Sequence, residues 1–120
     1  MDDSFAQLPP PVQALAVLAH AHRLQGDAER AALLFAAADA LQPDQPQLLA
    51  GWAAAELARG RPAPALQALE RLAFQPLPPS LRRAFHLLRA QALVGLDRRA
   101  EAGAAMRAAA DALSALETPA

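Results

Sequence analysis

Three histidines are the side chains of this sequence that could hold a metal ion or move a proton, and their spacing favours neither role. His20 and His22 are two residues apart, so on a helix they point to different sides and cannot share one ion. His86 lies far along the chain, with no carboxylate–histidine pattern around it. We therefore expect packed or solvated histidines, no metal site and no cofactor.

The carboxylates and hydroxyls also lack the arrangement that catalysis requires. Acid–base chemistry needs positioned partners within reach of one atom, whereas Asp2 and Asp3 lie in a terminal segment. Asp39 and Asp44 are interpreted as part of a solvated helix face and a turn. The chain has no cysteine and no glycine-rich phosphate loop. The serines lie near the termini or at a helix start, outside a nucleophile elbow: Ser4, Ser80 and Ser114. We predict that the protein is not an enzyme.

The bulk composition excludes two classes of partner. With a formal net charge of -1, the chain lacks the excess of lysine and arginine that binds phosphates, so we expect no nucleic-acid partner. The most apolar stretch, residues 14–19, is too short to span a membrane, and the acidic start does not resemble a secretory signal. We therefore predict a soluble, cytoplasmic protein of one domain, with no membrane contact.

Helical periodicity runs through six segments that are separated by glycine, proline or aspartate. No useful length alternates with a period of two, and β-branched residues are scarce, which predicts an all-α protein without strands. Ser80 is the expected N-cap of the fifth helix. Only 4% of the residues are aromatic, so a core of alanine and leucine requires closely spaced helices. The expected helices cover residues 12–24, 28–41, 47–59, 63–74, 81–94 and 98–116.

A repeat organises these segments into pairs. Gly26 and Gly60 are 34 residues apart, and so are Ala31 and Ala65. This is the period of the tetratricopeptide (TPR) repeat, in which small residues lie where paired helices cross. A third unit follows after about three extra residues in the linker 76–79. We predict three tandem TPR-like helix-turn-helix repeats in a short right-handed superhelix; a generic bundle with an accidental repeat is the alternative.

The repeat phase also sets the domain limits and the core. The units span about 12–45, 46–79 and 80–116, between a flexible, acidic and proline-rich leader at 1–11 and a frayed tail at 117–120. Phe35 and Trp52 stand at consensus positions and are expected in the core rather than on a binding surface. Leu18 and Met106 also occupy positions of the repeat pattern.

A TPR array holds peptides on the inner face of the first helix of each unit. Here that face is predicted to be small and mostly apolar, without the Lys, Arg and Asn set that grips a C-terminal carboxylate. Alanine leaves room for larger side chains of a partner, so an apolar helix or extended segment fits. The predicted partner-binding residues are Gln13, Ala16, His20, Arg23, Gln47, Ala50, Ala54, Leu57, Ala84, Leu87, Gln91 and Val94.

Residues 26–31 (GDAERA), followed by 33–34 (LL) and 41–43 (LQP), resemble the small TPR chaperones of bacterial type III secretion systems, above all the YscY type. The resemblance implies a cytoplasmic chaperone that shields an apolar segment of a small exported protein until export. It also implies a hetero-oligomer with that polypeptide. The alternative is a stand-alone TPR scaffold or an assembly factor for another envelope or pilus complex.

Overall fold

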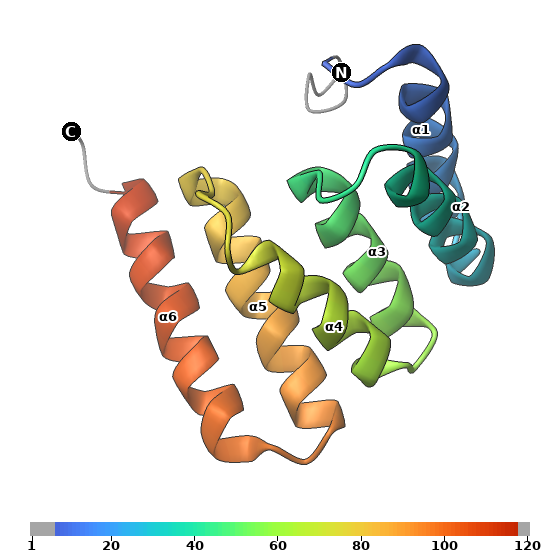
Figure 1. Cartoon of the computed structure of the whole chain (residues 1–120). Helices are drawn as coiled ribbons and strands as arrows, with labels where there is room; N and C mark the ends of the chain where they lie inside the picture. Colours follow the sequence, from blue (N-terminus) through green and yellow to red (C-terminus); the bar gives the residue numbers. More distant parts are fainter. Residues whose placement is uncertain (1–6, 118–120) are drawn as a thin grey trace.

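The computed structural model describes residues 7–117, which form six α-helices joined by short turns (Figure 1). Within this range there is no strand, so the predicted all-α class with six helices is confirmed. Most of the predicted leader and tail, residues 1–6 and 118–120, lies outside the described residues. The helices are α1 (Pro10–Leu24), α2 (Ala28–Leu41), α3 (Pro46–Ala58), α4 (Pro62–Leu72), α5 (Pro79–Gly95) and α6 (Arg99–Glu117).

Proline lies in the first turn of α1, α3, α4 and α5, and it moves their starts one or two residues ahead of the predicted ones. Its missing N–H is not needed in the first turn, and its fixed φ suits a helix. Residues 10–11, which we assigned to the leader, therefore belong to α1. The prediction that Ser80 caps α5 is wrong, because Pro79 begins this helix and Pro78 is its N-cap.

The turns that close α1–α2, α3–α4 and α5–α6 have the same geometry. A residue with positive φ stands in each, namely Gly26 (+84°), Gly60 (+73°) and Asp97 (+58°). The next residue donates its N–H to the carbonyl oxygen five positions earlier, which is the Schellman way of ending a helix. These bonds are Asp27 to His22 at 2.8 Å, Arg61 to Glu56 at 2.9 Å and Arg98 to Leu93 at 2.8 Å. Equivalent turns thus recur at spacings of 34 and 37 residues.

Each helical pair packs against the next, in a row from α1–α2 to α5–α6 (Figure 1). Helix α2 contacts α3 and α4 contacts α5, while α3 also touches α1 and α5. The core has two clusters, one on α1–α3 around the buried ring of Phe35, the other on α3–α6 around Leu69 and Leu93. Trp52 packs against both clusters, so the core role predicted for Phe35 and Trp52 is confirmed.

Leu18, Met106 and Phe74 are among the large apolar residues that are exposed. Leu18 is 52% and Met106 51% exposed, because each lies beside rather than on the buried stripe of its helix. Helices α1 and α6 end the row, so only one side of each has a neighbour. Phe74 is 91% exposed, since α4 ends at Leu72 rather than at Phe74.

Candidate functional site

A hollow of about 370 Å³ opens on the face formed by α1, α3 and α5. Helix α3 contacts both other helices, so it forms the middle of the hollow. Helix α1 supplies one side with His20 and Arg23, and α5 with the residues before it supplies the other. The remaining lining residues are Gln47, Ala50, Gly51 and Ala54 in the middle, and Pro78, Ser80, Leu81, Ala84 and Leu88 on the α5 side.

A second hollow of about 580 Å³ adjoins the first at the C-terminal ends of α3 and α5. Ala54 and Leu88 line both hollows, so the two form one continuous groove. We call this surface the α1/α3/α5 groove. Its second half is lined, besides those two residues, by Leu57, Ala58, Gly60, Pro62, Gln91 and Gly95.

Glycines bring the helices around the groove close together. A Cβ atom at Gly51 of α3 would overlap the ring of Phe35 on α2, so only glycine fits there without a shift of that ring. A Cβ atom at Gly95 would lie 2.9 Å from Cβ of Pro62, closer than real contacts. Because the side chains at Ala50 and Ala54 are also small, the middle of the groove stays open.

The groove gathers most of the residues that the repeat phase placed on the inner face. Ala16 is an exception and its prediction is wrong: it is fully buried in the cluster with Phe35, so no partner can reach it. Val94 lines a separate small hollow beside Met106. Gln13 and Leu87 line neither half of the groove. The groove contains His20, Arg23, Gln47, Ala50, Ala54, Leu57, Ala84 and Gln91.

The sequence reasoning missed two leucines of the lining, Leu81 and also Leu88. Leu88 is half-buried, packs against the α3–α6 cluster and lies where the two hollows meet. The signal was present, since Leu88 is four residues after Ala84 and three before Gln91, which is the spacing of one helix face. The three extra residues assigned to the linker 76–79 changed the expected inner-face positions of the third unit, so Leu87 was predicted instead of Leu88.

The lining of the groove has one permanently charged residue, Arg23. His20 and Arg23 stand one turn apart on α1, with Nη2 of Arg23 3.2 Å from Nδ1 of His20. Neither half of the groove has an aspartate or glutamate among its lining residues. Most of the lining is alanine, glycine, leucine and proline. The groove therefore combines an apolar floor with a basic edge on α1.

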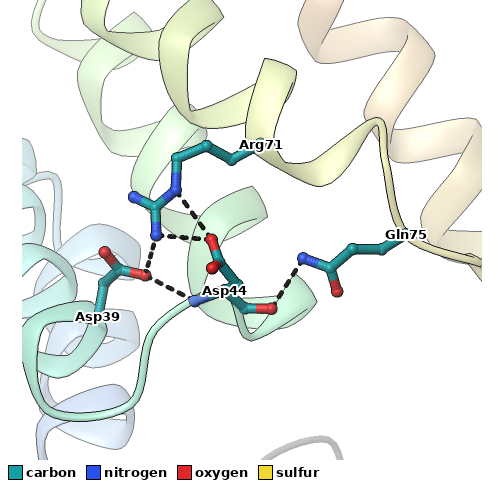
Figure 2. A network of polar contacts seen from close by, with 4 residues as sticks. All are labelled: Asp39, Asp44, Arg71 and Gln75. Carbon is teal, nitrogen blue, oxygen red and sulfur yellow. Dashed lines mark hydrogen bonds and ion pairs between the residues drawn. The ribbon is translucent and has the colours of Figure 1, made fainter.

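Two of the carboxylates considered for catalysis, Asp39 and Asp44, belong to a polar network outside the groove, whereas Asp2 and Asp3 lie outside the described residues (Figure 2). Asp39 at the end of α2 is buried, so its predicted place on a solvated face is wrong. Its Oδ1 accepts hydrogen bonds from Nη2 of Arg71 at 2.8 Å and from the backbone N–H of Asp44 at 3.1 Å. Nε of Arg71 also donates to Asp44 at 2.9 Å, and Gln75 donates to the Asp44 carbonyl oxygen at 2.8 Å. The network joins α2 to α4.

The three histidines lie in different surroundings. Nδ1 of His22 lies 3.8 Å from a carboxylate oxygen of Asp27, at the first turn. Burial lowers the pKa of His86 below its usual value, and the nearby charges of Arg89 and Arg82 lower this pKa further. Over residues 7–117, no three His, Asp or Glu side chains gather as a metal site would require.

The absence of a membrane-spanning helix and the lack of matching proteins complete the description. None of the helices in the described part of the chain is long and apolar enough to cross a lipid bilayer. In comparisons with known proteins, no family model, no curated protein and no solved structure matches the chain.

Proposed function

We propose that this protein is a polypeptide-binding module of the TPR type, with its three helical pairs in a short right-handed superhelix. Support comes from the equivalent turns at Gly26, Gly60 and Asp97, which repeat at 34 and 37 residues. The contacts of each pair with the next, and of α3 with α1 and α5, are those of a stacked repeat array.

The observation that carries the proposal is the α1/α3/α5 groove, because its lining comes from the first helix of every unit. Repeat arrays bind extended segments or helices on surfaces of this kind. The small side chains of Ala50 and Ala54 leave space that larger apolar side chains of a partner would fill. Each leucine or phenylalanine buried there would contribute about 1.5–3 kcal/mol before the cost of association is subtracted.

In this proposal the protein acts as a cytoplasmic chaperone of a type III secretion system. It holds an apolar segment of a small exported component, which would otherwise associate prematurely, and it releases that segment before export. The complex is a hetero-oligomer. A stand-alone scaffold of an envelope or pilus complex would use the same groove, but it would keep its partner in the finished assembly.

Ala54→Glu tests the groove. Ala54 is half-buried and lines both hollows, so a glutamate there can turn toward solvent while placing a charge where apolar side chains would bind. We expect a loss of partner binding of at least about tenfold, with the melting temperature nearly unchanged. Ala104→Glu, at an exposed position of α6, is the matched control and should bind as the unaltered protein does.

The assay is co-expression with the short open reading frames that neighbour the gene, followed by purification of any stable complex. If a complex forms and Ala54→Glu leaves it intact, the groove is not the binding surface. If no secretion component forms a stable complex with the protein, the chaperone proposal fails. A partner that stays in a finished envelope assembly would favour the scaffold.

A further inference from the structure

Arg23 is placed unusually among the arginines of the described chain, because it lies on the groove without a carboxylate partner. Its one recorded polar partner among residues 7–117 is His20. Some of the other arginines are tied to acidic groups, as Arg59 is to Glu56 at 2.7 Å and Arg71 is to Asp39 at 2.8 Å, whereas Arg89 on α5 is also half-buried without an ion pair to a described residue. Arg23 is half-buried on the side of the first hollow. No carboxylate of the described residues neutralises this guanidinium, which leaves it available to an acidic group of a partner.

The contact with His20 shows which kind of group would complete this site. A guanidinium only donates hydrogen bonds, so Nδ1 of His20 accepts from Arg23 and the proton of the neutral ring lies on Nε2. The pair therefore offers hydrogen-bond donors from both side chains and one full positive charge. A carboxylate, which only accepts hydrogen bonds and carries a negative charge, is complementary to both properties.

The rest of the lining indicates what carries the carboxylate. No aspartate or glutamate lines either half of the groove, so nothing there repels an acidic group or competes for Arg23. The floor at Ala50 and Ala54 and the opposite side at Leu88 are apolar. His20 and Arg23 come from α1, which forms one side of the hollow rather than its floor. A chain lying along the floor would thus meet them with a side chain.

We infer that the bound segment is apolar and carries one internal aspartate or glutamate, whose carboxylate binds Arg23 and His20. The inference rests on the proposed polypeptide-binding function and adds the chemistry of the partner to it. The apolar side chains of the segment occupy the floor of the groove, and the acidic side chain fixes the register at the α1 edge. An apolar segment without this charge fits the floor and leaves Arg23 unpaired, so it binds more weakly.

Peptide display with the purified protein tests the inference. Random peptides are fused to the coat protein through their C-termini, so the peptides have no free C-terminal carboxylate. Any carboxylate that a displayed peptide contributes therefore comes from an Asp or Glu side chain. Peptides that bind the unaltered protein and fail to bind Ala54→Glu are sequenced. We expect apolar sequences with a single Asp or Glu at a constant offset from the apolar positions.

The best selected peptide is then synthesised with an amidated C-terminus, together with a twin in which its acidic residue is replaced by the amide. Fluorescence anisotropy measures both on the unaltered protein, on Arg23→Gln and on Arg23→Lys. We expect the acidic peptide to lose about tenfold in affinity on Arg23→Gln, with part of the loss restored by Arg23→Lys. The amide twin should bind the unaltered protein and Arg23→Gln equally, because it lacks the carboxylate that would pair with Arg23.

Salt and a control arginine separate this pair from a general effect of charge. Binding of the acidic peptide to the unaltered protein should weaken between about 50 and about 500 mM NaCl, and binding to Arg23→Gln should not. Arg107→Gln changes an exposed arginine of α6 and should leave the affinity unchanged. A loss of affinity that is the same for both peptides on Arg23→Gln would point to a structural role and overturn the inference.

The two levels of the proposal fail separately. If selected peptides bind in the groove but lack acidic residues, or bind Arg23→Gln as tightly as the unaltered protein, the carboxylate inference is wrong and polypeptide binding stands. If every selected peptide binds Ala54→Glu as tightly as the unaltered protein, the peptides do not bind in the groove. The proposed function then fails, and the inference fails with it.

Discussion

His86 couples the stability of the fold to pH. It is half-buried on α5, and burial, followed by the charges of Arg89 and Arg82, lowers its pKa from the usual 6.5. The unfolded chain therefore binds a proton at this residue at a higher pH than the folded chain does. The free energy of unfolding is unaffected by this group above about pH 6.5 and falls as the pH drops below that value.

Replacing His86 by glutamine should reduce this dependence. Glutamine cannot titrate, so the melting temperature of His86→Gln should fall less steeply than that of the unaltered protein between about pH 6.5 and about pH 5. Melting curves followed by circular dichroism over this range provide the measurement. Parallel curves for the two proteins would show that the burial of His86 does not penalise its charged form.

At the scale of the helix, two glycines of similar helical context have opposite roles. A Cβ atom at Gly51 of α3 would overlap the Phe35 ring, which is almost fully buried and cannot move away freely. At Gly103 of α6, the nearest atom to such a Cβ is a guanidinium nitrogen of Arg107 at 3.5 Å, an ordinary contact with a flexible side chain. One glycine permits a close approach of helices, and the other only weakens its own helix.

Substituting alanine at each position should therefore change stability in opposite directions. Gly103→Ala should raise the free energy of unfolding by about 0.5–1 kcal/mol, because alanine is the better helix former. Gly51→Ala gains the same propensity, but overpacking costs about 1–3 kcal/mol, so the net effect should be destabilising. Urea denaturation of both variants measures the difference. A stabilised Gly51→Ala would mean that Phe35 can shift without cost.

The helices and turns were predictable from the sequence where residues close to them in the chain mark their beginning or end. Gly26 and Gly60 mark turns through their backbone freedom, and Asp97 occupies the same left-handed position in the third turn. Apolar periodicity could not show that Pro46 or Pro79 begins a helix, because proline carries no amphipathic signal. The exposure of Leu18 and Met106 depends on which helices end the row, and this is a tertiary property.

The lining residues of the groove were more predictable on α1 and α3, which the 34-residue spacing relates, than on α5. His20, Gln47 and Ala54 line the groove, as expected from the register, which sets which side of α1 and α3 they share. Ala16 was misplaced because the crossing with α2 buries it under Phe35, which the sequence alone does not reveal. The ion pairs of Arg71 with Asp39 and Asp44 were missed for a similar reason, since they join residues 32 and 27 positions apart.

At the scale of the whole molecule, the core is divided into two clusters that meet at Trp52. The network of Asp39, Asp44, Arg71 and Gln75 is a second connection, and it fastens the α1–α2 pair to α4 (Figure 2). All buried side-chain nitrogen and oxygen atoms in the described part of the chain have hydrogen-bond partners. Loss of the Arg71 guanidinium would remove a hydrogen-bond donor from the buried carboxylate of Asp39.

Arg71→Met should therefore lower the stability of the protein. The buried carboxylate of Asp39 would keep only the backbone N–H of Asp44, at a cost of about 1–2 kcal/mol once the partial exposure of Arg71 is considered. Urea denaturation gives the magnitude, and hydrogen exchange should show the largest loss of protection in α1 and α2. Arg83→Met, at an exposed position of α5, is the control and should change stability by less than about 0.5 kcal/mol.

The three equivalent Schellman turns also have a kinetic consequence. Each closes a helical pair through contacts that are near in sequence, so little loop entropy is lost and pairs of this kind form within microseconds to milliseconds. In the stacked array that we propose, folding can begin at any pair and spread to its neighbours. The α1/α3/α5 groove takes its lining from all three pairs, so it is completed only when the last pair docks. A folding intermediate with two docked pairs would have the turns and most helices of the final protein but no complete groove.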